Sequence, residues 1–221
     1  MTNSCESLGP RPAGAFRPTR AGGDQARTAA FFDLDKTIIA TSSAYAFGRE
    51  FLYNGLISPA ETLQLSLAKA SYMFSGLSSE GMDTTRDQLT AMVTGWSVDE
   101  VRSIARETMH HVVTPSIYAE ARELIRAHRA AGHHVVIVSA SAAVLVDIIA
   151  EELGVEHVIA TELAEEDGCF TGEVLFYCKG QNKAAALERT AAAEDIALRA
   201  SYAYSDSATD IPMLEKVSHP V

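Results

Sequence analysis

Short apolar runs that end in polar residues alternate along this chain with stretches of helical periodicity. The runs are rich in β-branched and aromatic residues, as is typical of the buried strands of a parallel sheet. The intervening stretches repeat their apolar positions every three to four residues and stop at glycines, as helices do. We expect strands at 29–32, 134–141, 157–160 and ending at 205–206, a hairpin around 167–174, and helices at 116–131, 142–153, from 181 and at 210–217. This alternation predicts an α/β fold, with a doubly wound parallel sheet covered by helices on both faces.

Between the first two strands the pattern is almost wholly helical. Two of the expected helices open with a capping box, Ser58 to Glu61 and Ser97 to Glu100, and glycines mark several of the ends. The four expected helices are 43–54, 58–75, 80–94 and 97–111. Helices joined by such short links form a bundle. We therefore predict an α/β core at 28–41 and 113–221, with a helical domain at 42–112 inserted into it.

Composition narrows the possible partners. The 221 residues are 47% hydrophobic and carry a formal net charge of −11, which disfavours nucleic acid and anionic membrane surfaces. No apolar run approaches the ~20 residues that span a bilayer. Residues 1–27 are rich in Pro, Gly and Arg and lack the apolar centre of a secretory signal, so we expect a disordered tail and a cytoplasmic protein.

Cysteines and histidines give no metal signature by themselves. The three cysteines, Cys5, Cys169 and Cys178, form no CxxC pair, so neither a disulfide framework nor a zinc site is indicated. The pairs His110-His111 and His133-His134 are adjacent, and adjacent side chains on a helix or strand point apart. We expect these histidines to be solvated or capping.

Chemistry is concentrated where the first strand ends. Asp33, Asp35 and Thr37 follow the apolar residues 29–32 directly, and ligands of open α/β sheets gather at the carboxyl ends of the strands. Two carboxylates there repel each other unless a cation or a shared proton intervenes. Mg²⁺ prefers carboxylate oxygens and keeps waters that a phosphorylated ligand can replace. The alternative for this segment alone is an acidic loop.

A hydroxyl and a lysine follow at later strand and helix ends. Ser139 or Ser141 ends the second strand beside the start of a helix, where amides bind phosphate, although a serine there can also simply cap the helix. Lys183 lies in the first turn of a helix, where the helix dipole disfavours a cation unless an anion is near. The alternative, a solvated surface lysine, applies more strongly to Lys179.

Two more carboxylates follow the last predicted strand. Asp206 stands at the strand end, whereas Asp210 precedes a helix with Pro212 in its first turn and is also a possible N-cap. Three acids at strand ends, a serine and a first-turn lysine in this order are improbable by chance.

With these motifs the chain resembles the haloacid dehalogenase-like hydrolases, and among them the phosphoserine phosphatase-like subfamily IB. The DxDxT motif is matched by Asp33, Asp35 and Thr37. The later motifs are matched by a strand-end serine, a lysine and two acids, which are Ser139, Lys183, Asp206 and Asp210. The resemblance covers residues 28–221.

The resemblance implies a Mg²⁺-dependent phosphatase that acts on a small phosphorylated metabolite through an aspartyl-phosphate. Asp33 would be the nucleophile and Asp35 the general acid and base. The metal would be held by Asp33, the main-chain carbonyl of Asp35, and Asp206. Thr37, Ser139 and Lys183 would bind the phosphoryl group, and Asp210 would orient Lys183 or a metal-bound water. The helical insertion would be the cap over the active site.

Some positions depart from the family pattern. Ser207 stands where a glycine is usual, and Thr209 where an asparagine often precedes the second acid. The glutamate that binds the amine of phosphoserine, nine residues after the nucleophile, is replaced by Ser42. We therefore expect a substrate other than phosphoserine, with phosphoserine phosphatase proper as the alternative.

Two further alternatives differ in class. A P-type ATPase fragment would explain the string Asp35-Lys36-Thr37, but Ile38 replaces its following glycine. A non-catalytic interaction protein on this fold would be expected to have lost an acid or the lysine, and all are present.

The sequence gives least information about which cap residues select the substrate. Arg49 is a candidate for an anionic part of the substrate, the alternative being a surface ion pair with Glu50 or Glu61.

The end of the chain raises one more expectation. The sequence ends at 218–221, where the resemblance places the start of another strand. We therefore expect a shortened chain whose last sheet edge lacks hydrogen-bond partners.

Overall fold

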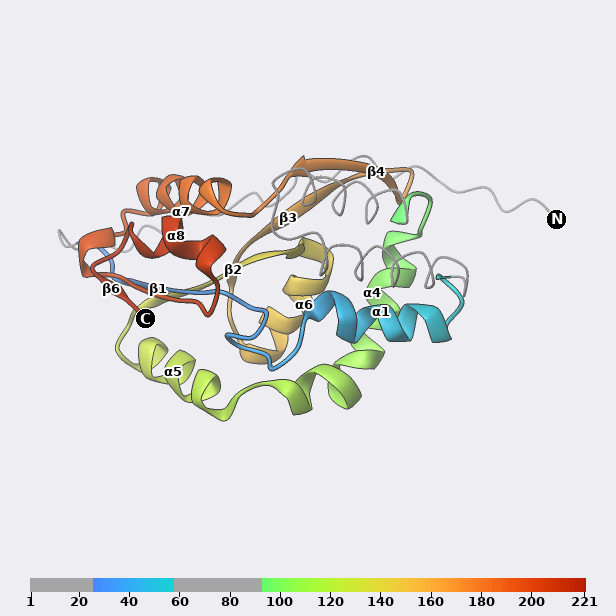
Figure 1. Cartoon of the computed structure of the whole chain (residues 1–221), viewed down its shortest axis with the longest axis horizontal. Coiled ribbons are helices and arrows are strands. Elements are labelled where there is room, and N and C mark those ends of the chain that lie inside the picture. Colours follow the sequence, from blue (N-terminus) through green and yellow to red (C-terminus); the bar gives the residue numbers. More distant parts are fainter. Residues whose placement is uncertain (1–25, 58–92) are drawn as a thin grey trace.

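The computed structural model describes residues 26–57 and 93–221. Within them, six strands form one sheet with the strand order β4-β3-β2-β1-β5-β6. Neighbouring strands are parallel except for the antiparallel pair β3 and β4. The strands are β1 (Ala29–Phe32), β2 (His134–Ala142), β3 (His157–Glu166), β4 (Cys169–Phe176), β5 (Tyr202–Tyr204) and β6 (His219–Pro220). Figure 1 shows this sheet between two groups of helices. The predicted α/β class is confirmed.

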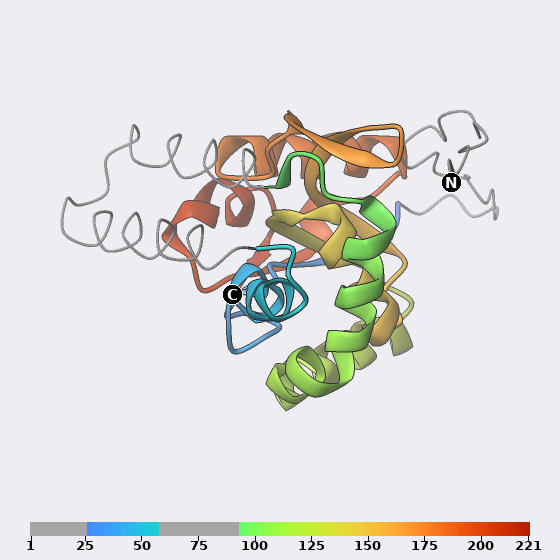
Figure 2. The same cartoon turned by 90° about the vertical axis from the view of Figure 1, so that its right-hand side faces the viewer.

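Alternation along the central strands gives the sheet two buried faces. In β1, Ala30 and Phe32 belong to one hydrophobic cluster, whereas Ala29 and Phe31 belong to another on the opposite face. Helices α1 (Ser43–Tyr53), α4 (Val98–Thr108), α5 (Ala119–Ala130) and α6 (Ala143–Leu153) bury residues in the first cluster, and α7 (Gln181–Ala193) and α8 (Ile211–Leu214) in the second. Figure 2 shows the same arrangement from the side. Because both faces of β1 are covered, its end is held rigidly, and this is where the first acidic motif begins.

Several predicted helix ends are confirmed. Ser97 is the N-cap of α4, and its side chain accepts a hydrogen bond from the Glu100 backbone N–H. Gly154 ends α6 in the left-handed conformation, at φ 65°, which a glycine adopts without steric cost.

Several elements differ from the predicted bounds. The helix predicted at 210–217 is reduced to the four residues of α8, Ile211–Leu214. The helix predicted at 116–131 begins only at Ala119, because 114–116 form a 3-10 turn around Pro115 and Ile117 is extended, bridging to Ile39. The strand predicted at 157–160 continues to Glu166, because its second half pairs with β4 in the predicted hairpin.

The expectation that the last sheet edge lacks partners is wrong for β5. Residues 219–220 form β6, parallel to β5. The Val221 backbone N–H donates to the Ala203 carbonyl, and the Ser205 N–H donates to the Val221 carbonyl. Residues 219–220 are thus the start of the strand that was expected after residue 217, and this short strand supplies the hydrogen-bond partners of β5.

Other predictions fall outside the described residues. These are the helices at 58–75 and 80–94, apart from the last two residues of the latter, and most of the disordered tail predicted at 1–27. The expectation of disorder is wrong at the end of that tail, because Arg27 forms a β-bridge to Ile196. Of the predicted helical domain, α1 and α4 are described, and both pack in the hydrophobic cluster that also contains α5 and α6. The division of the chain into a core and a cap stays a prediction.

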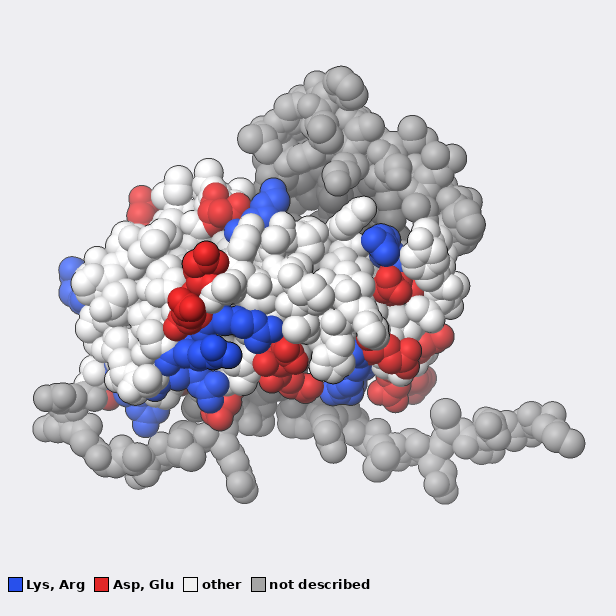
Figure 3. All heavy atoms as spheres, turned by 90° about the horizontal axis from the view of Figure 1, so that it is seen from below, with Lys and Arg blue, Asp and Glu red and all other residues white. Residues whose placement is uncertain are grey.

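Two observations concern the surface and the helices of the described residues. No helix in residues 26–57 and 93–221 combines the length and hydropathy needed to cross a membrane. On the face shown in Figure 3, several basic side chains lie next to one another, with acidic side chains beside them.

Candidate active site

The predicted site residues meet at the carboxyl ends of three neighbouring strands. Phe32 at the end of β1 is in register with Ile137 of β2 and Tyr204 of β5, so the residues that follow these three positions converge. They line a cavity of about 280 Å³. The lining residues are Asp33, Asp35, Lys36, Ser42, Ser139, Ala140, Lys179, Lys183, Asp206, Ser207, Thr209 and Asp210. Six of the eight residues singled out in the sequence are among them. Thr37 contacts two of the lining acids, and Arg49 lies elsewhere.

A buried charge cluster holds the proposed nucleophile. Lys183, in the first turn of α7, is only 1% exposed, and its Nζ lies 2.6 Å from Asp33 Oδ1 and 2.5 Å from Asp210 Oδ2. The Ser205 hydroxyl also donates to Asp210 Oδ2 at 2.8 Å. The sequence argument that a first-turn lysine needs an anion nearby is thus answered by two carboxylates.

Burial and charge act on this cluster in opposite directions. Burial raises the pKa of Asp33 to about 6, and the negative charge of Asp210 adds to this, although Lys183 acts in the lowering direction. For Lys183, burial lowers the pKa, but the charges of Asp33 and Asp210 outweigh it and the pKa is raised. Lys183 is therefore a firmly charged ammonium between two carboxylates.

Asp35 is fixed on the other side of the cavity by α1 and β2. The Ser43 backbone N–H, at the start of α1, donates to Asp35 Oδ1 at 3.0 Å. The Ser141 hydroxyl lies 3.5 Å from Asp35 Oδ2 and 2.6 Å from the Ser43 hydroxyl. The N-cap residue of α1, Ser42, makes no side-chain capping bond. Asp35 thus accepts a hydrogen bond from an amide at the N-terminus of α1, and its carboxylate is held at the cavity. The sequence did not indicate that Ser43 and Ser141 would position Asp35.

A single hydroxyl joins two acids from different strands. Thr37 Oγ1 lies 3.4 Å from Asp33 Oδ2 and 3.3 Å from Asp206 Oδ1, and it accepts a hydrogen bond from the Asp206 backbone N–H. A hydroxyl has one proton, so it cannot donate fully to both carboxylates. Two converging carboxylates that lack a full set of donors are an oxygen ligand set suited to Mg²⁺.

The capping alternatives for the serine and the last acid are not observed. Helix α6 has Ala142 at its N-cap without a side-chain bond, and the Ser139 hydroxyl instead accepts from the Ser141 N–H. Asp210 stands at the N-cap of α8, but its carboxylate bonds Lys183 and Ser205 rather than a helix amide. Ser139 is 2% exposed and lines the cavity, where it is available to an anion.

A cysteine beside the site is excluded as a nucleophile by its environment. Cys178 is buried, and its thiol lies 3.6 Å from the Ile159 carbonyl. Burial raises the pKa of this thiol to about 12, so the thiolate that would attack a substrate is absent near neutral pH.

Residues at the cavity that the sequence did not single out include two lysines. Lys179 and Lys36 both line the cavity. Lys36 has a left-handed backbone, at φ 63°, within the turn after β1. The sequence favours a solvated surface position for Lys179. Its position just before the first turn of α7, four residues from Lys183, is the sequence feature that could have indicated that Lys179 lines the cavity.

Arg49 is not brought to the cavity. Its side chain is exposed, lies 3.9 Å from Glu50 and stacks over the Tyr53 ring at 5.9 Å. This is the surface ion pair that the sequence left open as the alternative.

Comparison with known proteins places this geometry in a family context. Residues 30–215 match the family model described as haloacid dehalogenase-like hydrolase, a stretch that includes every site residue from Asp33 to Asp210.

Individual relatives agree with that match. A Mycobacterium tuberculosis protein called probable phosphatase Rv3661 is 50% identical over 204 residues, which are 91% of this chain and 71% of the relative. Phosphoserine phosphatase SerB1 from the same species is 31% identical over 214 residues, covering 96% and 70%. A crystal structure of a Bordetella pertussis protein with unknown function superposes with a TM-score of 0.78 at 29% identity, covering 89% of each chain.

Proposed function

Because the chain belongs to the haloacid dehalogenase-like hydrolases, we propose that it is a Mg²⁺-dependent phosphatase that hydrolyses a small phosphomonoester through an aspartyl-phosphate on Asp33. The observation that carries the proposal is the buried Lys183, which holds one oxygen of Asp33 beside the cavity while Asp210 holds the lysine. A carboxylate fixed in this way has a defined direction of attack, and part of the cost of ordering the nucleophile is met by the fold.

The first chemical step would form the covalent intermediate. A carboxylate oxygen of Asp33 attacks phosphorus, and the bond between phosphorus and the alcohol oxygen breaks. Asp35 donates a proton to the leaving oxygen, so that a neutral alcohol departs. The bonds from Ser43 and Ser141 keep the Asp35 carboxylate in one orientation for this transfer.

The second step would release phosphate. Asp35, now a carboxylate, takes a proton from a water molecule, and the water oxygen attacks phosphorus. The bond between phosphorus and Asp33 breaks, which returns both acids to their starting states and frees inorganic phosphate. One residue can serve both steps because the leaving alcohol and the entering water occupy the same side of phosphorus.

The other site residues would bind the transferring group. An ammonium has three N–H donors, and Lys183 directs two of them at Asp33 and Asp210, which leaves one for a phosphoryl oxygen. Ser139 and Thr37 are the proposed hydroxyl ligands of that group. Arg49 has no place in this scheme, because its guanidinium pairs with Glu50 away from the cavity.

Asp33, the main-chain carbonyl of Asp35, and Asp206 are the residues that would hold Mg²⁺. The shared Thr37 hydroxyl supports this, since it leaves Asp33 and Asp206 short of donors. When bound, the ion would neutralise charge on the phosphoryl oxygens.

The alternatives are a phosphoserine phosphatase proper and a non-catalytic protein on this fold. The name of the relative SerB1 favours the former and Ser42 in the cavity disfavours it. The latter is disfavoured because the residues proposed for catalysis lie together at the cavity. A cytoplasmic location is part of the proposal.

The proposal is tested by the metal dependence of hydrolysis of p-nitrophenyl phosphate. We expect chelation with EDTA to remove activity and Mg²⁺ to restore it. Ca²⁺ should substitute poorly, because it prefers a larger and looser oxygen shell. Full activity after rigorous chelation would exclude the metal, and no activity with any divalent ion would favour the non-catalytic alternative.

Substrate preference gives a separate prediction. We expect the kcat/KM for phosphoserine to be lower than that for at least one other phosphorylated metabolite in a panel, because Ser42 offers no carboxylate to an amine. Ser42→Glu should shift preference toward amine-bearing substrates. Thr41→Glu is the matched control, since it adds the same charge at a residue outside the cavity lining. A wild-type protein that prefers phosphoserine over the whole panel would contradict this.

A further inference from the structure

A second group of side chains that can bind a metal lies at the amino-terminal ends of the strands, opposite the end that carries the cavity. His134 is the first residue of β2, His157 is the first residue of β3, and Glu194 directly follows α7. The cavity residue Ser139 is five residues further along β2, about 16 Å at the usual rise of a strand. The cluster is therefore separate from the proposed catalytic residues.

Strand register brings the two histidines together on one face. His157 is the register partner of Val136, and His134 lies two residues before Val136, so all three side chains point to the same side of the sheet. Val136 packs in the cluster formed with Leu187 of α7, whose C-terminal end carries Glu194.

The turn that carries Glu194 is anchored independently of the histidines. The Arg27 backbone N–H donates to the Asp195 carbonyl at 2.8 Å, and the Ala197 N–H donates to the Arg27 carbonyl at 2.8 Å. These backbone bonds fix the main chain beside Glu194 without a contribution from His134 or His157.

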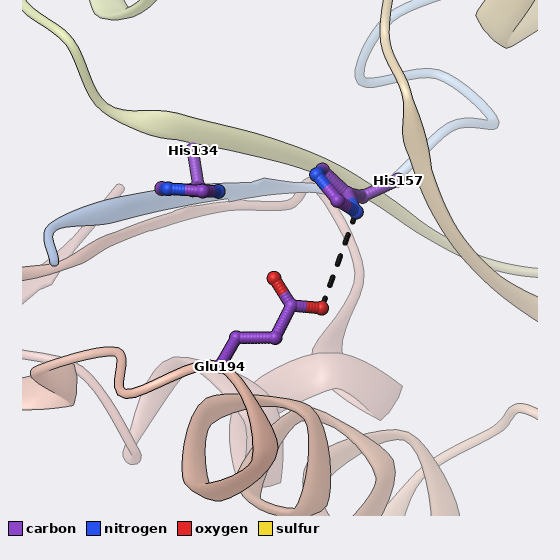
Figure 4. A group of neighbouring side chains, drawn as sticks. All are labelled: His134, His157 and Glu194. Atoms are coloured by element: carbon purple, nitrogen blue, oxygen red, sulfur yellow. Dashed lines mark ion pairs between the residues drawn. The ribbon is translucent and has the colours of Figure 1, made fainter. Parts of the chain in front are cut away.

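The distances are those of an open ligand set. The imidazole centroids are 5.7 Å apart, and His157 Nδ1 is 4.0 Å from Glu194 Oε1. One nitrogen from each ring and one carboxylate oxygen all lie within 4.8 Å of one another. Figure 4 shows the Glu194 carboxylate directed toward the two imidazoles.

One atom of the cluster has no partner. The Glu194 side chain is only 6% exposed, and its Oε2 is buried without a hydrogen bond from any described residue. The separation of 4.0 Å between Oε1 and His157 is also too long for a hydrogen bond. A buried carboxylate oxygen without a donor is unfavourable, and a bound cation would satisfy it. The cation must be one that also accepts imidazole nitrogen.

We propose that His134, His157 and Glu194 bind a divalent transition-metal ion of the Zn²⁺ class, which joins the beginnings of β2 and β3 to the end of α7. Two imidazoles and one carboxylate are a known ligand set for Zn²⁺, with water in the fourth position. Mg²⁺ and Ca²⁺ prefer oxygen ligands alone, so this site and the proposed catalytic site would select different ions. Binding requires the ligand atoms to approach from 4.0–4.8 Å to the roughly 3.4 Å that tetrahedral bonds of about 2.1 Å impose, which small side-chain rotations supply.

The expectation that the histidine pairs are merely solvated or capping is thus wrong for His133-His134. His133 Nδ1 lies 2.9 Å from His128 Nδ1 of α5, while His134 faces His157 near α7. The two adjacent side chains do point apart, as predicted, but His133 has a partner five residues earlier on α5, and His134 has one on β3. In the other pair, His110 and His111 are exposed as expected.

The test counts metal ions bound by the whole chain. After chelation and exchange into buffer with Mg²⁺, Zn²⁺ is titrated by calorimetry and the bound metal is measured by elemental analysis. We expect the His134→Ala/His157→Ala variant to bind one Zn²⁺ fewer than the wild type. The control His110→Ala/His111→Ala removes the same number of imidazoles from exposed positions and should bind the same number of ions as the wild type.

Two further readouts separate ligation from a general effect on folding. Glu194→Gln keeps the shape of the side chain and should weaken binding at this site at least about tenfold. Zn²⁺ at a hundredfold excess over its Kd should raise the wild-type Tm by about 5–10 °C, and this increment should be lost in both site variants. If the wild type and the histidine variant bind the same number of Zn²⁺ ions, or if Glu194→Gln binds as tightly as the wild type, the three residues form only a charge pair and the site does not exist. Phosphatase activity is not a readout, so this result is independent of the proposed function.

Discussion

Replacing Asp33 by asparagine should abolish turnover while the protein stays folded. The carboxamide is nearly isosteric with the carboxylate, but it is not a nucleophile. Its oxygen can still accept from Lys183, which also keeps Asp210 as a partner. We expect kcat for p-nitrophenyl phosphate to fall by about 10³-fold or more, as when a covalent nucleophile is removed. Steady-state kinetics measures the loss, and circular dichroism melts measure the fold.

Asp35→Asn is the informative comparison for this variant. It should slow both the formation and the breakdown of the phosphoenzyme, since the same carboxyl group would donate and then accept the proton. It should leave Mg²⁺ binding in place, because the proposed ligand at Asp35 is the main-chain carbonyl. An Asp33→Asn protein that keeps more than a few per cent of wild-type kcat would disprove the covalent mechanism, whatever the behaviour of Asp35→Asn.

The sequence was sufficient where one segment determines its own environment. The apolar residues 29–32 form β1 with both faces buried, and Asp33 follows directly. The sequence favours Lys183 over Lys179, because a cation in the first turn of a helix requires an anion nearby, and the structure places two carboxylates there. In such cases the hydrophobic pattern and the helix dipole are sufficient to predict the position of the residue.

The sequence was insufficient where a position depends on contacts between distant segments. Ser43 and Ser141, 98 residues apart, meet at Asp35, and each by itself looks like an ordinary helix-start serine. Lys179 reaches the cavity because the β4 strand returns the chain to the ends of the parallel strands.

The same limit applies to the second cluster. His134, His157 and Glu194 come from three elements, and strand register and helix packing alone bring them together. The spacing of histidines along the sequence shows only which of them can meet within one helix or strand, so it does not reveal a group formed by three elements.

Removing the buried lysine should have the second large effect, on stability as well as on catalysis. Lys183→Met keeps the length of the side chain but leaves Asp33 and Asp210 buried without their cation. Breaking a buried ion pair by removing one partner typically costs about 3–5 kcal/mol, and we expect a loss of that size in the free energy of unfolding. Activity should be lost as well, because Asp33 is no longer held and the phosphoryl group loses a donor. Urea denaturation in the presence of EDTA measures the stability without a contribution from bound metal.

Two variants separate the buried charge from a lysine near the cavity. Lys179→Met removes a partly exposed lysine from the cavity wall and should change the free energy of unfolding by only about 0.5 kcal/mol. In Lys183→Met/Asp210→Asn, one of the two stranded carboxylates is also neutralised, so the double variant should be more stable than the sum of the single effects predicts. That coupling arises because the cost of Lys183→Met is mainly the cost of an uncompensated buried carboxylate. Strictly additive effects, or a Lys183→Met protein as stable as the wild type, would show that the three charges do not act as one unit, and the argument that Lys183 positions the nucleophile would fail with them.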